Sequence, residues 1–405
     1  MMNDLAVKLS QRVERIKPSP TFAISARADE LTAAGKPVIN LSVGEPDFDT
    51  PQHIKDAAIK AIQAGATKYT AIDGIKELKQ AIVDKFKREN QLTYMPSQIL
   101  VSVGAKHSIY NLFAAVLNEG DEVIFAAPYW VSYPDMTLLT DGVPVPVKTT
   151  FAQHFKLQPE ALEAAITPRT RIVLLNSPSN PTGIAYSLDE LKALGEVIKR
   201  HPHVLVASDD IYEHSLFSKP FCNILNACPE LYDRAVIING VSKSYAMTGW
   251  RIGYAAGPAK VIAAMKKVQS QSTSNPTACS QYATIAALEG DQQCIKTMRK
   301  AYQERHDFVI SELKTMPGIS VVPSDGTFYT FPCVEGLYNK EAGINSDLDV
   351  AEFLLTEANL AVVPGSAFGT PGHIRLCFTT SMENLVEAVK RLRKAATLLK
   401  GKVTL

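Results

Sequence analysis

Six short apolar segments, separated by longer stretches with helical spacing, constrain the fold of this chain more than any other feature of its sequence. They are residues 99–103, 123–126, 172–175, 204–207, 236–238 and 252–255. Nearly unbroken apolar runs are typical of strands covered on both faces in a mostly parallel sheet, although their spacing alone leaves buried helical segments open. The stretches 108–117, 188–200 and 261–269 have apolar residues three and four positions apart, which predicts helices. Ser187 followed by Glu190 predicts a capping box before the second. The alternation predicts an α/β fold.

A second, smaller domain is predicted from the length and from a change of pattern near residue 297. A chain of 405 residues exceeds what one ordinary core accommodates. Beyond residue 297 come a charged helical stretch, strand-like pieces at 328–331 and 374–378, and a closing helix from Met382. The segment up to about Leu41 is too short to fold alone. We therefore expect a large domain of residues 46–300 and a small α+β domain of residues 1–45 and 301–405.

The charge balance and the cysteines exclude several classes of protein. Lys and Arg number 42 against 41 Asp and Glu, which gives no electrostatic reason to expect nucleic acid or a membrane surface as the main partner. No signal peptide and no membrane-spanning run is expected. The six cysteines show neither CxxC spacing nor the density of a disulfide scaffold. Reduced thiols and a cytoplasmic location follow as expectations.

Polar residues close several of the predicted strands, where open α/β sheets bind ligands. Gly104, Ala105 and Lys106 precede a helix and suit a phosphate, but a tight turn explains the glycine equally well. The run 176–183 (NSPSNPTG) follows another apolar run and fits a turn, but Asn180 could also point its amide into a cleft.

Two charged residues at strand positions each have a structural and a functional explanation. Asp209 ends an apolar run, and it could cap a helix or pair with a cationic ring nitrogen. Arg375 lies inside the strand-like run 374–378, so it needs a planar anion. That anion could be a structural Asp or Glu, or the carboxylate of a substrate.

The most specific feature is the run 242–254 (SKSYAMTGWRIGY), which follows a predicted strand. Most lysines are solvated surface residues, and that is the plain interpretation of Lys243. The small residues next to Lys243, and Arg251 eight positions later, fit a different interpretation, in which this lysine is a nucleophile. Partial burial and the arginine charge would lower the lysine pKa from about 10.4 toward neutrality, as an amine nucleophile requires.

Taken together, these segments resemble the class I aminotransferases of fold type I, and most closely the prokaryotic aspartate aminotransferase subgroup. The similarity runs from about Val13 to the end. It also includes the motifs 40–48 (NLSVGEPDF), 68–70 (KYT) and 128–130 (PYW).

The resemblance implies pyridoxal 5′-phosphate (PLP) as the cofactor, held as a Schiff base on Lys243, which would also shuttle the proton of the substrate α-carbon. No metal is expected. Asp209 would pair with the pyridine nitrogen of the cofactor. The family implies further contacts with the cofactor. Tyr212 and Asn180 would bind the ring oxygen, and Trp130 would stack on the ring face. The phosphate and ring edge would be contacted by Gly104, Ala105, Lys106 and Arg251.

The resemblance also implies how amino acid and 2-oxo acid substrates bind. Arg375 would hold their shared α-carboxylate, with Asn180, Trp130 and the backbone at Gly44. Tyr69 matches a family tyrosine that reaches the phosphate of the neighbouring subunit. A homodimer with shared active sites is therefore expected.

At the position that binds the second carboxylate of the substrate, this chain differs from the animal enzymes. Those enzymes use an arginine from the partner subunit, whereas this chain has Ser270 at the matching position. Lys106 is then the expected cation, with Ser19 and Thr21 as polar helpers. The expected reaction converts L-aspartate and 2-oxoglutarate into oxaloacetate and L-glutamate. Lys17 lies where the subgroup places a residue linked to prephenate, so the order of aspartate, prephenate and aromatic substrates stays open.

Two other functions compete with this one. A PLP-dependent lyase or synthase on the same fold would share Lys243 and Asp209. A non-catalytic binding module fused to a DNA-binding segment is disfavoured, because only about forty residues precede the first motif and they contain no helix-turn-helix pattern.

Overall fold

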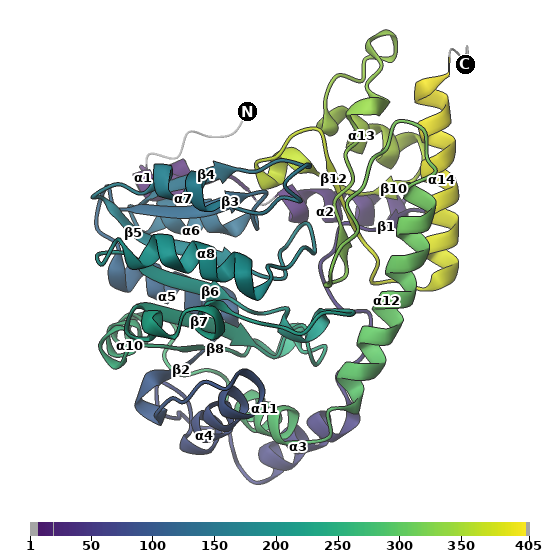
Figure 1. Ribbon diagram of the computed structural model, residues 1–405. Coiled ribbons are helices and arrows are strands. Elements are labelled where there is room, and N and C mark those ends of the chain that lie inside the picture. Colours follow the sequence, from purple (N-terminus) through teal and green to yellow (C-terminus); the bar gives the residue numbers. More distant parts are fainter. Residues whose placement is uncertain (1–6, 19, 402–405) are drawn as a thin grey trace.

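The computed structural model describes residues 7–18 and 20–401, and its centre is a seven-stranded sheet in the order β2-β8-β7-β6-β5-β3-β4 (Figure 1). Only β8 runs antiparallel to its neighbours. The predicted α/β fold with a mostly parallel sheet is confirmed. The strands are β2 (Ile99–Ser102), β3 (Glu122–Ala127), β4 (Val143–Lys148), β5 (Thr170–Asn176), β6 (Leu205–Asp209), β7 (Ala235–Gly240) and β8 (Gly253–Ala256).

Helices cover both faces of this sheet, which explains why its strands are apolar throughout. Successive side chains of a strand point to opposite faces. Val236 and Ile238 of β7 accordingly lie in the core formed with α5, α6 and α10, whereas Ile237 lies in the core that includes α4, α7, α8 and α11. The helices of this part are α3 (Gln52–Gln63), α4 (Lys76–Lys85), α5 (Ala105–Val116), α6 (Ser132–Leu139), α7 (Pro159–Ala165), α8 (Leu188–Lys199), α9 (Ile224–Ala227), α10 (Ala259–Ser272) and α11 (Ala278–Glu289).

A second core lies beside the sheet, among the helices on the right of Figure 1. These are α12 (Gln293–Leu313), α13 (Asp347–Glu357) and α14 (Met382–Lys400). They pack with an antiparallel sheet of β11 (Val363–Pro364), β12 (Ile374–Cys377) and β9 (Tyr329–Thr330), and with β1 (Ile39–Asn40) paired parallel to β10 (Leu360–Ala361). The two cores support our proposed division into residues 46–300 and residues 1–45 with 301–405. Helix α12 crosses the proposed boundary without a break. It contributes to both cores, since Ile295 packs in the first and Met298 in the second.

The N-terminal segment contacts both parts of the molecule. Helix α1 (Gln11–Arg15) lies against α6, and Arg12 and Arg15 pair with Asp141 just beyond it. Helix α2 (Pro20–Ala33) instead lies against β10 and β11. The N-terminal segment therefore contacts the proposed large domain through α1 and the smaller core through α2.

Membrane-spanning helices were not expected from the sequence. In the described part of the chain, no helix combines the length and the apolar character needed to cross a bilayer. The six cysteines are free thiols, as predicted.

Candidate active site

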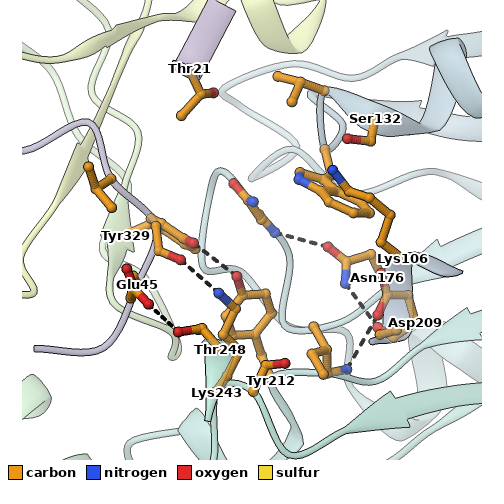
Figure 2. Close-up of a pocket in the computed structure, with 18 of the residues that line it drawn as sticks. Thr21, Glu45, Lys106, Ser132, Asn176, Asp209, Tyr212, Lys243, Thr248 and Tyr329 are labelled. Carbon is orange, nitrogen blue, oxygen red and sulfur yellow. Dashed lines mark hydrogen bonds between the residues drawn. The ribbon is translucent and has the colours of Figure 1, made fainter. Parts of the chain in front are cut away.

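A cavity of about 500 Å³ opens where β5 and β6 end, between the large sheet and the smaller core (Figure 2). Asn176 ends β5 and Asp209 ends β6, so the parallel strands deliver both side chains to one edge of the sheet. The cavity brings together most of the residues singled out from the sequence: Gly44, Ala105, Lys106, Trp130, Asn180, Asp209, Tyr212, Lys243, Arg251 and Arg375.

Lys243 follows β7 and points into this cavity, so the surface interpretation of this lysine is wrong. Its Nζ donates a hydrogen bond of 2.7 Å to the carbonyl oxygen of Gly44. Burial lowers its pKa to about 8, and the charges of Arg375 and Arg251 act in the same direction, against the opposing charge of Glu45. A substantial fraction of this amine is therefore uncharged near neutral pH.

Asp209 is a buried carboxylate that does not cap a helix. Its Oδ2 accepts a 2.6 Å hydrogen bond from the Tyr133 hydroxyl, and the backbone of Ile211 approaches Oδ1 at 3.4 Å. Burial raises its pKa to about 6, although these hydrogen bonds and the charge of Lys243 lower it. Within the described residues, no lysine or arginine forms a salt bridge with it. A cationic group in the cavity would stabilise its charged form.

Arg375, on β12, is 2% exposed and has no acidic partner among the residues that the structure describes. Nη1 donates to the side-chain oxygen of Asn180 at 3.0 Å, and Nη2 donates to the carbonyl of Ser42. Its Nε lacks a partner in the same part of the chain. A buried, uncompensated guanidinium is costly, which favours a bound carboxylate over the structural acid considered from the sequence.

The start of α5 forms a third side of the site. Gly104 precedes the helix with a φ of +83°, and a side chain there would collide with the guanidinium of Arg251. The first turn therefore presents free backbone N–H groups next to an arginine, an arrangement that suits an anion. Lys106, in the same turn, has its Nζ 4.9 Å from the centre of the Trp130 ring. Burial and Arg251 lower its pKa, whereas Asp135 raises it.

The structure does not bring every predicted residue into the cavity. Tyr69 is 91% exposed and does not line it. Ser270 also lies outside the lining and bonds to the carbonyl of Lys267. Thr21 lines the cavity, Lys17 lies near Asp135, and Ser19 is outside the described residues.

Among the residues that line the cavity, Tyr133, Asn176 and Tyr329 were given no role from the sequence. Tyr133 bonds to Asp209, Asn176 links the backbone of Asp209 to that of Asn180 by two hydrogen bonds of 2.9 Å, and Tyr329 lies beneath Arg375. From the sequence, Asn176 is noted only as the first residue of the polar run 176–183. Tyr133 lies one helical turn beyond Trp130, and only the fold shows that this turn faces β6.

A buried polar network supports the loop segments of the site. Lys85, at 0% exposed, pairs with Glu213, and His214 joins Glu89 to Ser244 through two contacts of 2.9 Å. Glu213 directly follows Tyr212 in the chain, and Ser244 directly follows Lys243. The network therefore holds the backbone next to these two cavity residues in place. The ligand atoms of Glu89, Glu213 and His214 lie within 4.8 Å of one another, but the Lys85 ammonium already supplies the positive charge there.

Known proteins match this chain over nearly its whole length. The family model for aminotransferase class I and II matches residues 36–392. The aspartate/prephenate aminotransferase of Nitrosomonas europaea is 55% identical over 392 residues, which cover 95% of this chain and 99% of that protein. The aspartate aminotransferase of Geobacillus stearothermophilus is 50% identical over 96% of this chain and 98% of its own length. The crystal structure of the aspartate aminotransferase from Rhizobium meliloti superimposes with a TM-score of 0.94 at 46% identity, covering 96% of this chain and 99% of that one.

Proposed function

The chain belongs to the family of class I and II aminotransferases, and on that premise we propose that it moves an amino group between L-aspartate and 2-oxoglutarate, giving oxaloacetate and L-glutamate. Its fold is that of the fold type I transferases, as predicted. The observation that carries the proposal is one cavity that holds a lysine of lowered pKa together with three further cationic side chains, Arg375, Lys106 and Arg251.

The proposed cofactor is PLP, which when bound accepts electron density from the substrate α-carbon and carries the amino group. The residues present fit this group. Asp209 is a buried carboxylate with room for a cationic ring nitrogen, and Lys243 offers an amine that is partly uncharged. The backbone N–H groups of Ala105 and Lys106 and the guanidinium of Arg251 would hold the phosphate. Gly104 leaves room for this arginine, and its own N–H donates to the Ser102 carbonyl at 2.8 Å.

The remaining cavity residues are assigned by their geometry. Tyr212 and Asn180 present a hydroxyl and an amide to the ring oxygen, and Trp130 presents its indole to the ring face. Lys243 Nζ would take the proton from the substrate α-carbon and pass it to the cofactor carbon that receives the amino group. The Gly44 carbonyl holds the same Nζ when it carries a proton.

Two cations match a dicarboxylic substrate. Arg375 lines the cavity without an acidic partner in the described chain, and a guanidinium matches the geometry of the α-carboxylate. Lys106 is available for the second carboxylate, with Thr21 near the same space. A lysine is a point charge on a flexible stem and discriminates less sharply than an arginine. Prephenate, named in the Nitrosomonas relative, is therefore a further substrate worth testing.

We also propose a homodimer that shares its active sites and resides in the cytoplasm. The exposure of Tyr69 supports the dimer, because a large aromatic ring on the surface suits contact with another chain. The six free thiols support the reducing compartment.

Replacing Lys243 with Ala tests the central assignment. The variant should lose turnover and the near-visible absorbance of bound PLP. Borohydride should fix the cofactor to a peptide containing residue 243 in the wild type and not in the variant. Lys267→Ala, an exposed lysine of α10, serves as the control and should behave as wild type. Normal activity in the Lys243 variant would refute the proposed function.

Replacing Lys106 with Ala tests the substrate class. The value of kcat/KM for aspartate should fall at least about thirtyfold relative to that for alanine, the equivalent of about 2 kcal/mol for a desolvated ion pair. A panel of amino donors against 2-oxoglutarate, oxaloacetate and prephenate measures this ratio. Equal losses for aspartate and alanine would make Lys106 a cofactor contact instead.

A further inference from the structure

We propose that Tyr329 is a positioning residue that links Arg375 to Tyr212, with its ring beneath the guanidinium and its hydroxyl against the second tyrosine. The inference rests on the proposed function, in which Arg375 receives the substrate carboxylate and Tyr212 faces the cofactor ring oxygen. It adds a residue that the sequence motifs did not indicate.

Tyr329 makes both contacts from a fixed position. It is 1% exposed, and its hydroxyl lies 2.9 Å from that of Tyr212, a contact drawn as a dashed line in Figure 2. The Cζ atom of Arg375 lies 4.6 Å from the centre of the Tyr329 ring, within the range of a cation–π interaction. The Tyr212 and Tyr329 rings meet nearly edge to face, at 80° and 5.8 Å.

The sheet explains why these residues meet. Tyr329 on β9 pairs directly with Cys377 on β12, and Arg375 lies two residues before Cys377. Side chains two residues apart point to the same face of a strand, so Tyr329 and Arg375 are diagonal neighbours on one face. The packing around the hydroxyl is equally tight, because a side chain at Gly44 would collide with it. The Tyr329 hydroxyl therefore packs against the residue whose carbonyl oxygen accepts the hydrogen bond from Lys243.

The direction of the hydrogen bond follows from the number of protons available. Either hydroxyl can donate in the pair. Tyr212 has one hydroxyl proton, and if it donates to the cofactor ring oxygen, Tyr329 must donate to Tyr212. A hydroxyl that accepts a hydrogen bond becomes a stronger donor in turn. The Tyr329 hydroxyl thus strengthens the hold of Tyr212 on that oxygen and favours its negatively charged form.

Arg375 makes the strength of the Tyr329 hydroxyl as a hydrogen-bond donor depend on whether substrate is bound. A positive charge above the Tyr329 ring withdraws electron density and makes its hydroxyl a better donor. A carboxylate bound to Arg375 neutralises this charge and weakens the same donor. Binding of a carboxylate should therefore be felt at Tyr212 through Tyr329, and it should raise the proton affinity of the bound cofactor.

The test compares holoenzyme variants by the pH midpoint of the cofactor absorbance, with and without maleate as a non-reacting dicarboxylate. In Tyr329→Phe the midpoint should rise by about half a unit, a modest effect expected for losing one bond of a hydrogen-bonded chain. The further rise caused by maleate should be smaller than in wild type. Tyr302→Phe is the matched control, since it removes a hydroxyl from a ring 5.4 Å from Phe328 in the same aromatic cluster. Both of its values should equal those of the wild type.

The outcomes separate the two proposals. A wild type whose absorbance does not respond to PLP would overturn the proposed function. A wild type that titrates normally, beside a Tyr329→Phe variant of equal thermal stability and identical midpoints, would overturn the role of Tyr329. A raised midpoint with an undiminished response to maleate would overturn the link to Arg375.

Discussion

Lys243 illustrates how burial produces reactivity at a single residue. An exposed lysine has a pKa of about 10.4 and is almost fully charged at neutral pH. Burial lowers the pKa of Lys243 to about 8, with Arg375 and Arg251 contributing. The uncharged amine is the nucleophile, so the same surroundings that disfavour the charge prepare the residue for a carbonyl partner.

This shift predicts how PLP loading depends on pH. The uncharged fraction of Lys243 falls tenfold per pH unit below its pKa. The second-order rate of PLP binding to apoenzyme should therefore rise with pH up to about 8 and level off above it. Stopped-flow absorbance measures the rate, and an N-acetylated lysine amide provides the unburied reference. A rate that kept rising to pH 10, as for the reference amine, would contradict the lowered pKa.

Most site residues predicted from the sequence follow an apolar run or belong to a polar motif, whereas Arg375 lies inside a strand-like run. Asp209 and the polar run 176–183 could be predicted because parallel strands end at the same edge of the sheet. Tyr329 could not, because its role depends on a register between β9 and β12 that brings it beneath Arg375. The alternatives for Asp209 and Arg375 were likewise decided only by contacts across the chain.

Among the elements, α8 shows a signal that is complete in the local sequence. Ser187 Oγ accepts a hydrogen bond of 3.3 Å from the backbone of Glu190, and the Glu190 side chain accepts one of 2.7 Å from the backbone of Ser187. All the partners lie within four consecutive residues, so the predicted capping box needed no tertiary information. Strand β4 is the opposite case. Its two prolines argue against a strand, and it forms because an edge position tolerates a missing donor.

Replacing Ser187 with Ala should lower the free energy of unfolding by about 1 kcal/mol, the usual cost of an N-cap. Ser187 is exposed, so the change leaves the core packing intact. Urea titration followed by circular dichroism measures the difference. Ser187→Asp keeps an acceptor at the cap and should retain wild-type stability. Equal losses in both variants would assign the effect to something other than the cap.

At the scale of the whole molecule, the site depends on parts that the local sequence cannot place relative to one another. The cavity takes Thr21 from the N-terminal segment, Lys243 from the large sheet and Arg375 from the smaller core. The change of pattern near residue 297 indicated a second core. It could not show that α12 would run continuously through both cores, because helical spacing says nothing about which neighbour a helix face meets.

Tyr69 suggests that the site also depends on a second copy of the chain, under the proposed dimer. The residue is 91% exposed and outside the cavity of its own chain, yet its motif matches a tyrosine that serves the neighbouring site. If sites are shared, each combines Lys243 of one chain with Tyr69 of the other. A dimer of a Lys243→Ala chain and a Tyr69→Ala chain then contains one site with both changes and one site with neither.

This arrangement predicts complementation between two impaired variants. After unfolding and refolding an equal mixture, half of the dimers should be mixed, and one of their two sites should be intact. About one quarter of all sites should thus regain wild-type kinetics by random pairing of a symmetric dimer. Wild-type affinity for PLP and wild-type turnover would distinguish these sites from the residual activity of the Tyr69 variant. Activity that merely averages the two parents would place Tyr69 outside the neighbouring site and leave each chain with a self-contained one.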